Sequence, residues 1–133
     1  MDVNAAIEDF LAGETFAVAG ASRDRAKYGN KVLRAYLQSG REAIPVNPTE
    51  TQVEGIHAVP SVVSLTKDVH GLSIITPPEV TERIVEEAAR TGIRRIWMQP
   101  GAESDEAIET ARNAGIEVIA GGPCVLVALR FRE

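Results

Sequence analysis

The chain of 133 residues is long enough to bury a substantial core, and we expect residues 1–133 to form a single domain. Hydrophobic residues make up 44% and charged residues 25%, and the net charge of −5 argues against nucleic-acid and anionic-membrane partners. The one cysteine excludes an intrachain disulfide, and without a secretory signal or a membrane-spanning run in the sequence we expect a cytoplasmic protein.

The first third of the chain alternates helix and strand patterns. Residues 2–12 have the spacing of an amphipathic helix, and "TFAVAG" at 15–20 is an apolar run of strand length that ends in glycine. Residues 30–39 show helical apolar spacing closed by Gly40, and "EAIPVNP" at 42–48 is a strand ended by a proline. These patterns predict two strands joined through a helix.

The remaining residues continue this alternation after a less regular segment at 49–69. We expect that segment to hold a short edge strand near 56–59 and a short helix near 61–66. The later patterns predict a strand at 70–78, a helix at 79–91, a strand at 94–101, a helix at 104–115, a strand at 117–122 and a short helix at 123–130, with Pro123 at its tolerated first position.

The expected strands are near-continuous apolar runs, which indicates burial on both faces. Strands of this kind that alternate with helices are typical of a parallel sheet covered by helices on both sides. With right-handed crossovers, the sequence therefore predicts an α/β fold, a doubly wound, mostly parallel and Rossmann-like sheet of about five strands.

The loop after the first strand has the composition of a phosphate-binding loop. In "VAGASRDRAKYG", Gly20 allows a tight turn, Ser22 adds a hydroxyl, and the start of the next helix offers free amides. Arg23, Arg25 and Lys27 add three cations. The alternative is that the glycine only turns the chain and the cations are solvated, but the position between a strand and a helix favours phosphate.

Two features of the sequence argue against a nicotinamide dinucleotide as the phosphate ligand. The loop reads G-A-S-R-D-R, with one glycine where the dinucleotide fingerprint needs G-x-G-x-x-G. The second strand ends in Asn47 and Pro48, where that fingerprint needs a carboxylate for the ribose hydroxyls. A P-loop motif is also absent from the sequence.

A set of short motifs carries a family resemblance over about residues 15–128. "VAGASRDRAKYGNKVLRAYL", "IPVNP", Gly55, "IITPP" and "IWMQPG" resemble the stand-alone coenzyme A-binding proteins, which are similar to the N-terminal coenzyme A-binding domain of the succinyl-CoA synthetase alpha subunit. The resemblance implies that the ligand is coenzyme A (CoA) or an acyl-CoA. The ribose phosphate of CoA also suits an amide with nearby cations better than a carboxylate at position 47.

The resemblance further implies a set of binding residues at the strand ends. Gly20, Ala21, Ser22 and Arg23 line the pyrophosphate, with Lys27 as a further phosphate partner. Val46, Asn47 and Pro48 flank the adenosine, and Thr76, Pro77 and Pro78 form the opposite wall, with Val80 and Ile84 below it. Gln99, Pro100 and Gly101 lie nearer the pantetheine.

The sequence offers no evident catalytic group or metal site, so we expect a protein that binds CoA and is not an enzyme. The synthetase carries a phosphorylated histidine on a second domain, and neither His57 nor His70 fits that role. Cys124, near the start of the last helix, could form a mixed disulfide with the CoA thiol, but a small buried cysteine is the more ordinary interpretation. Two alternatives remain, namely an NAD(P)-dependent oxidoreductase or redox sensor, and an interaction module that needs an unidentified protein partner.

Overall fold

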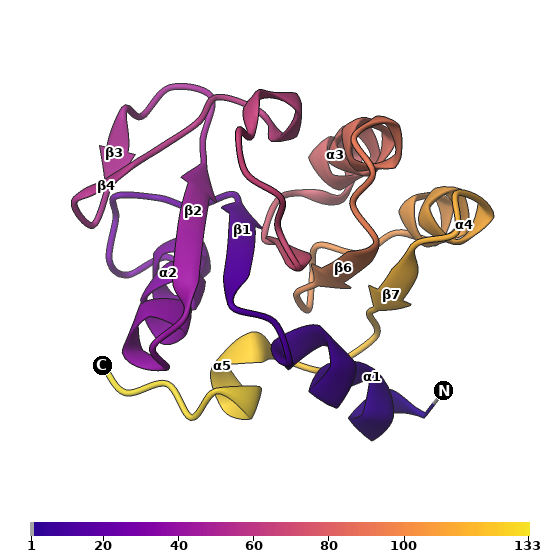
Figure 1. The fold of residues 1–133 in the computed structure, drawn as a ribbon, viewed down its shortest axis with the longest axis horizontal. Helices are drawn as coiled ribbons and strands as arrows, with labels where there is room; N and C mark the ends of the chain where they lie inside the picture. The colour runs from indigo at the N-terminus through magenta and orange to yellow at the C-terminus, as the bar shows by residue number, and fades with distance from the viewer. Residues whose placement is uncertain (1) are drawn as a thin grey trace.

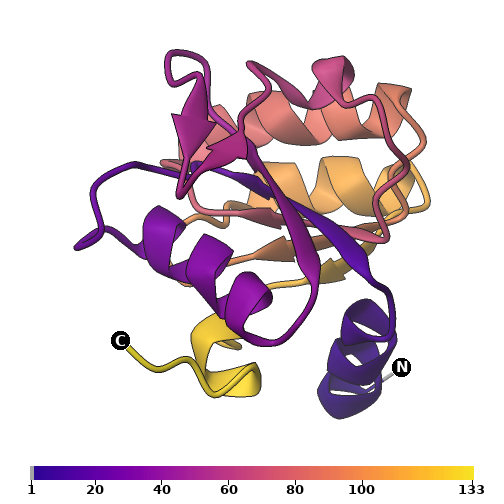
Figure 2. The same cartoon turned by 60° about the vertical axis from the view of Figure 1, so that its left-hand side comes forward.

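A computed structural model describes residues 2–133, which form a five-stranded parallel sheet between two layers of helices (Figure 1, Figure 2). The order across the sheet is β2-β1-β5-β6-β7, so the chain adds one strand beside β1 and then returns to build the other side. The strands are β1 (Thr15–Ala19), β2 (Glu42–Val46), β5 (Gly71–Ile74), β6 (Arg95–Met98) and β7 (Glu117–Ile119). The predicted fold class is confirmed.

The sheet order places a topological switch point between β1 and β5. Ala19, the last residue of β1, lies level with Val46 of β2 on one side and with Ile74 of β5 on the other. Counting only the strands of this sheet, the order is 2-1-3-4-5, and in such sheets ligands bind beyond the carboxyl ends of the strands next to the switch point. The loops after β1, β2 and β5 are therefore the place to look for a site.

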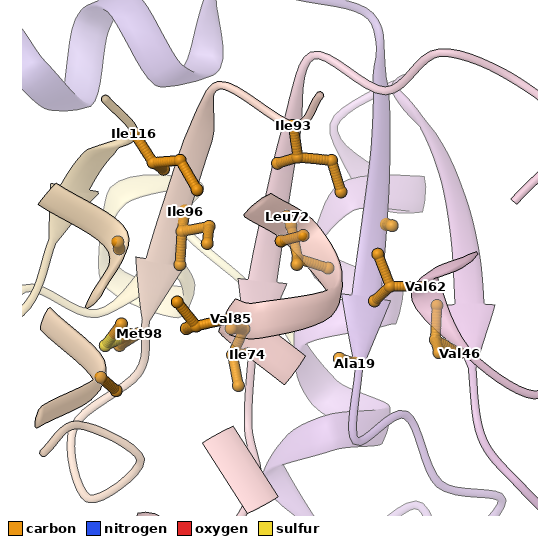
Figure 3. Close-up of a cluster of buried hydrophobic side chains, with 14 residues drawn as sticks. Ala19, Val46, Val62, Leu72, Ile74, Val85, Ile93, Ile96, Met98 and Ile116 are labelled. Atoms are coloured by element: carbon orange, nitrogen blue, oxygen red, sulfur yellow. The ribbon is translucent and has the colours of Figure 1, made fainter. Parts of the chain in front are cut away.

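The helices cover the two faces of the sheet in separate groups. One face packs against α3 (Pro78–Arg90), α4 (Asp105–Asn113) and a 3-10 turn at Val62–Ser64. Its core is aliphatic, with Leu72, Ile74 and Ile96 of the sheet under Val85 of α3 (Figure 3). The other face packs against α1 (Val3–Leu11), α2 (Tyr28–Gln38) and α5 (Val125–Ala128).

The face under α1, α2 and α5 carries the aromatic part of the core. Phe16 of β1 stacks on Phe10 and on Tyr36, with ring centroids 5.4 and 4.7 Å apart, and Trp97 meets Phe10 edge-on at 5.3 Å. Trp97 is fully buried, and its indole N–H donates to the Pro123 carbonyl at 3.0 Å. The large rings fix α1 and α2 on the sheet, and so fix the helix that follows the first loop.

Two expectations about short elements are wrong in detail. Instead of an edge strand at 56–59, β3 (Gln52–Val53) and β4 (Ile56–His57) form a separate antiparallel hairpin, and only Val59 makes a bridge to Val46 of β2. The hairpin turns through Glu54 and Gly55, whose φ angles of 51° and 77° suit a two-residue turn. Pro123 is not the first residue of the last helix, because Cys124 is its N-cap.

None of the helices within residues 2–133 is long and apolar enough to cross a membrane.

Candidate functional site

The phosphate loop, residues 20–27, leaves the end of β1 through a conformation that requires glycine. Gly20 has a φ of 93°, and a Cβ atom there would lie 2.1 Å from the carbonyl oxygen of Ile75. Its own N–H donates to the Val46 carbonyl at 3.3 Å. The first residue of the loop is therefore held between the backbones that follow β2 and β5, at the switch point of the sheet.

A second glycine, in the first turn of α2, packs against this loop, although the sequence pattern singled out only Gly20. A Cβ atom on Gly29, in the first turn of α2, would lie 1.9 Å from the Gly20 carbonyl oxygen. This is the close packing of helix on strand that the last glycine of a dinucleotide fingerprint allows. The segment between Gly20 and Gly29 is longer than the corresponding segment of that fingerprint, so the sequence pattern did not reveal that the two glycines pack together.

The loop presents a row of unoccupied backbone donors. Within residues 2–133, the amides of Ser22 and Arg23 meet no acceptor, and neither does that of Tyr28 in the first turn of α2; all three residues reach solvent. Lys27, the N-cap of α2, gives no side-chain hydrogen bond to this turn. Free amides and the positive end of a helix dipole together favour an anion such as phosphate.

Asn30 is a functional neighbour that the sequence did not reveal. Its side chain is fully buried, and its amide nitrogen donates to the Ser22 carbonyl at 2.8 Å and to Glu54 at 3.0 Å. Its oxygen accepts from Arg34 at 2.6 Å. Because one side chain joins the loop, the hairpin and α2, Asn30 fixes the loop conformation; a polar residue in a helix carries no sequence signal for such a role.

At the end of β2, two of the predicted residues hold the local structure together and the third is exposed. Val46 is buried in the core. Asn47 donates to the Ala21 carbonyl at 2.8 Å, and its oxygen accepts from the backbone amides of Thr49 and Glu50 at 2.8 and 3.0 Å. Asn47 therefore ties the end of β2 to the phosphate loop, while Pro48 is the exposed residue that a ligand can touch.

The wall after β5 is built from a strand end and a helix start. Thr76 shares a hydrogen bond with Thr81 at 2.7 Å, Pro77 is the exposed N-cap of α3, and Pro78 is its first residue. Val80 is half-buried, and Ile84 packs against the aliphatic core. Thr76 lies beside the phosphate loop, because its methyl group would be 3.1 Å from a Cβ atom on Gly20, and Pro77 is exposed next to it.

After β6, one predicted residue is buried and two are exposed. Gln99 is buried, and its side chain accepts from the Val125 amide at 2.8 Å and donates to the Cys124 sulfur at 3.3 Å. Pro100 and Gly101 are exposed. Gln99 thus joins β6 to α5 and has both polar ends of its side chain occupied within the chain.

The cations of the phosphate loop are not equivalent. Arg23 lies 3.6 Å from Glu50 and Arg25 lies 3.8 Å from Glu54, whereas Lys27 has no carboxylate within 4.0 Å among residues 2–133. A hollow of about 310 Å³ lies between Arg23 and the tip of the β3–β4 hairpin. The carboxylate that the sequence lacks at position 47 is present nearby in space, as Glu50.

Of the two histidines, His70 lies away from this edge of the sheet, whereas His57 pairs with Gln52 on the β3–β4 hairpin. His70 precedes β5, where its ring nitrogen meets the Asp9 carbonyl at 2.8 Å, and His57 is exposed on the hairpin. A larger hollow of about 410 Å³, between residues 62–69 and 91–95, also lies at the amino ends of the strands. Neither His70 nor this larger hollow adds to the site at the carboxyl ends.

Comparison with known proteins identifies the family to which this arrangement belongs. The model of the CoA-binding domain family matches residues 14–130. The chain is a member of the CoA-binding domain family. The resemblance drawn from the sequence is confirmed, and the alternative of an NAD(P)-binding oxidoreductase is not favoured.

Relatives of this CoA-binding domain occur both alone and inside longer proteins. An uncharacterised protein of Bacillus subtilis, YneT, is 29% identical over 103 residues, which are 77% of this chain and 76% of that protein. The alpha subunit of an ADP-forming acetate–CoA ligase II from Pyrococcus furiosus is 26% identical over 130 residues. That match spans 90% of this chain but only 28% of the ligase subunit.

Solved structures of small proteins share the fold over nearly their whole length. A conserved hypothetical protein from Pyrococcus furiosus is 39% identical, with a TM-score of 0.83 over 87% of this chain and 99% of that one. A hypothetical protein from Pyrococcus horikoshii is 26% identical, with a TM-score of 0.89 over 96% of this chain and 89% of that one. The domain therefore matches proteins of its own size as well as the ligase subunits.

Proposed function

We propose that this domain binds CoA or an acyl-CoA through the phosphate loop, and that it acts by recognition rather than by catalysis. The observation that carries the proposal is the row of free amides between Gly20 and the first turn of α2, at the switch point of the sheet. Lys27 stands beside these amides without a carboxylate partner among residues 2–133. Membership of the CoA-binding domain family supports CoA as the source of the phosphate.

We propose that the ligand lies along the strand ends, with each of its parts against a different loop. The pyrophosphate lies over the phosphate loop, where Ser22 still has its hydroxyl proton to donate while its oxygen accepts from the Asp24 amide at 3.1 Å. The adenosine lies against Pro48 and the wall of Thr76 and Pro77. The pantetheine runs toward Pro100 and Gly101, and Val46, Asn47, Ile84 and Gln99 support these contacts from behind.

A non-catalytic role is supported by how the carboxylates near this edge are used. Asp24 accepts from the Ala26 amide at 3.0 Å, Glu54 accepts from Asn30, and Glu103 accepts from the Gly101 amide at 2.9 Å. Each of these three carboxylates is already hydrogen-bonded by a donor of the chain itself. We propose that the domain corresponds to the CoA-holding part of the longer ligase subunits and leaves chemistry to other domains.

A thermal-shift panel with CoA, acetyl-CoA, NAD and NADP tests this proposal. A ligand at 100 times its Kd stabilises the folded protein by about 2.7 kcal/mol, which is several degrees for a domain of this size. We expect CoA and acetyl-CoA to raise the midpoint and NAD to leave it unchanged. A shift with NAD or NADP and none with CoA would show that the loop holds a different dinucleotide.

A further inference from the structure

Two carboxylates stand against the arginines of the phosphate loop. Glu50 lies in the segment after β2, 3.6 Å from Arg23, and Glu54 lies at the hairpin turn, 3.8 Å from Arg25. The arginine side chains are 72% and 65% exposed, whereas the carboxylates are 34% and 21% exposed. The acidic partners are therefore fixed against the protein surface, and the cations reach into solvent.

These ion pairs are weak, so the guanidinium groups stay available to another anion. Both separations exceed hydrogen-bond length, and ion pairs between exposed side chains contribute little free energy. A phosphate monoester carries more charge than a carboxylate and can accept two parallel hydrogen bonds from one guanidinium. An arriving phosphate can therefore replace either carboxylate at small cost.

The position of the pairs indicates which phosphate they meet. In nucleotide-binding α/β folds, the ribose lies at the end of the second strand, where a carboxylate binds its hydroxyls or a nearby arginine binds a phosphate on it. Glu50 is anchored to that end of β2, because its amide donates to Asn47 and Asn47 donates to the phosphate loop. The pyrophosphate has its own donors in the free amides of the loop.

We propose that Arg23 and Arg25 are specificity-determining residues for a phosphate monoester on the ribose, with Glu50 and Glu54 as the counter-charges that this phosphate displaces. This inference rests on the proposed function and moves Arg23 from the pyrophosphate to the ribose end of the ligand. The carboxylates keep the arginines from weakly held anions, because only a ligand already anchored at the loop amides competes with them effectively. A nucleotide with bare ribose hydroxyls leaves both ion pairs intact.

The surroundings of Glu54 indicate that the exchange needs no movement of the hairpin. Asn30, fully buried, donates to the Glu54 carboxylate at 3.0 Å, so this carboxylate keeps a partner when Arg25 leaves it. Glutamine at position 54 can accept the same hydrogen bond without the charge. The substitutions Glu50→Gln and Glu54→Gln therefore remove the counter-charges and preserve the local structure.

Calorimetric titration with CoA and with dephospho-CoA, which lacks the ribose phosphate, tests the inference. In the unmodified protein we expect CoA to bind at least about tenfold more tightly than dephospho-CoA, as charge-assisted contacts to a monoester allow. Arg23→Gln with Arg25→Gln should bring that ratio close to one. Glu50→Gln with Glu54→Gln should raise it by about three- to tenfold, because the repulsion of the monoester is removed.

The two double variants are expected to move one ratio in opposite directions, which loss of structure cannot do. The remote ion pair of Lys67 and Glu42, at 2.6 Å, supplies the control, and replacing both residues by glutamine should leave the ratio unchanged. If CoA and dephospho-CoA bind equally, or the ratio survives loss of the arginines, the inference fails while the proposed function stands. If neither ligand binds the unmodified protein, both fail.

Discussion

Gly29 lies where the first turn of α2 crosses the end of β1, and the carbonyl oxygen of Gly20 leaves no room for a side chain there. Since α-helix propensity alone favours alanine over glycine by about 1 kcal/mol, the contact must decide the effect of a substitution. A Cβ atom on Gly29 would lie only 1.9 Å from this backbone oxygen, which cannot move without moving the phosphate loop. Helix and loop therefore pack so closely at this point that only glycine fits at position 29.

We expect Gly29→Ala to lower the free energy of unfolding by about 1–3 kcal/mol, as overpacking does, and to weaken CoA binding at least tenfold. Gly92→Ala is the matched control, since Gly92 has a φ of 79° but open space around its Cα. It should cost about 1–2 kcal/mol through backbone strain and leave the Kd for CoA unchanged. Chemical denaturation and calorimetry measure both quantities, and normal CoA affinity in Gly29→Ala would contradict this role.

Lys27 is the cation most directly available to a ligand, because it caps α2 and has no carboxylate within 4.0 Å among residues 2–133. We expect Lys27→Glu to weaken CoA binding by about tenfold or more, since the change places a negative charge at the helix N-terminus beside the phosphates. Arg94→Glu, an exposed charge reversal at the opposite end of the sheet, should leave the Kd unchanged. Equal losses in both variants would indicate an effect of net charge instead of a local contact.

At the scale of elements, α1 is fastened to the sheet by a charged contact as well as by Phe10. Asp9 accepts from the Arg95 guanidinium at 2.8 Å, across the amino end of β6. The hydrogen bond from Arg95 holds the pKa of the Asp9 carboxyl below its usual value of 3.8. A lowered pKa means that the ionised form is favoured by folding.

The stabilisation from Asp9 is therefore present above about pH 4 and is lost as the pH falls through the lowered pKa of the folded state. We expect Asp9→Asn to be less stable than the unmodified protein at pH 7, and the difference in urea midpoint to shrink below pH 3.8. High salt should reduce the difference, because the pair is partly exposed. A gap that stays constant down to about pH 2.5 would exclude this ion pair as its cause.

The long helices and the five buried strands were predictable because their apolar spacing reflects packing on a two-sided sheet. The short elements were not, since two residues per strand show no periodicity: β3 and β4 depend on the turn through Glu54 and Gly55. The start of α5 depended on a distant contact, the hydrogen bond from Trp97 to the Pro123 carbonyl. A local turn thus accounts for the hairpin, and a tertiary contact accompanies the start of α5.

At the scale of the whole molecule, sheet order decides which loops meet, and the sequence alone does not contain it. The motifs located Gly20, Asn47 and Gln99 at strand ends, but not the bond from Asn47 to the Ala21 carbonyl or from the Val125 amide to Gln99. Once β2 lies beside β1, Glu50 comes against Arg23, although 26 residues separate them along the chain. The sequence thus predicted a candidate site at the strand ends, but not the charge pairing around it.

The whole-molecule charge poses a final question, because the domain carries −5 and its proposed ligand is also an anion. Salt weakens the attraction of the ligand to local cations, which lowers affinity, and it also weakens the repulsion from the net negative charge, which raises affinity. At about 0.05 M salt the screening length is about 14 Å, so both the loop cations and distant carboxylates act on the ligand, but a cation in contact interacts more strongly than charges spread over the surface. We therefore expect the attraction to Arg23, Arg25 and Lys27 to prevail.

The expected outcome is that raising the salt from about 0.05 to 0.5 M weakens CoA binding by about three- to tenfold, as contacts between exposed charges are screened. Calorimetric titration at the two salt concentrations measures the change, with pantetheine as an uncharged ligand whose affinity should hardly respond. Tighter binding of CoA at high salt would mean that the net negative charge dominates. The phosphates would then have to depend on the backbone amides of the loop, which are dipoles with no net charge to screen.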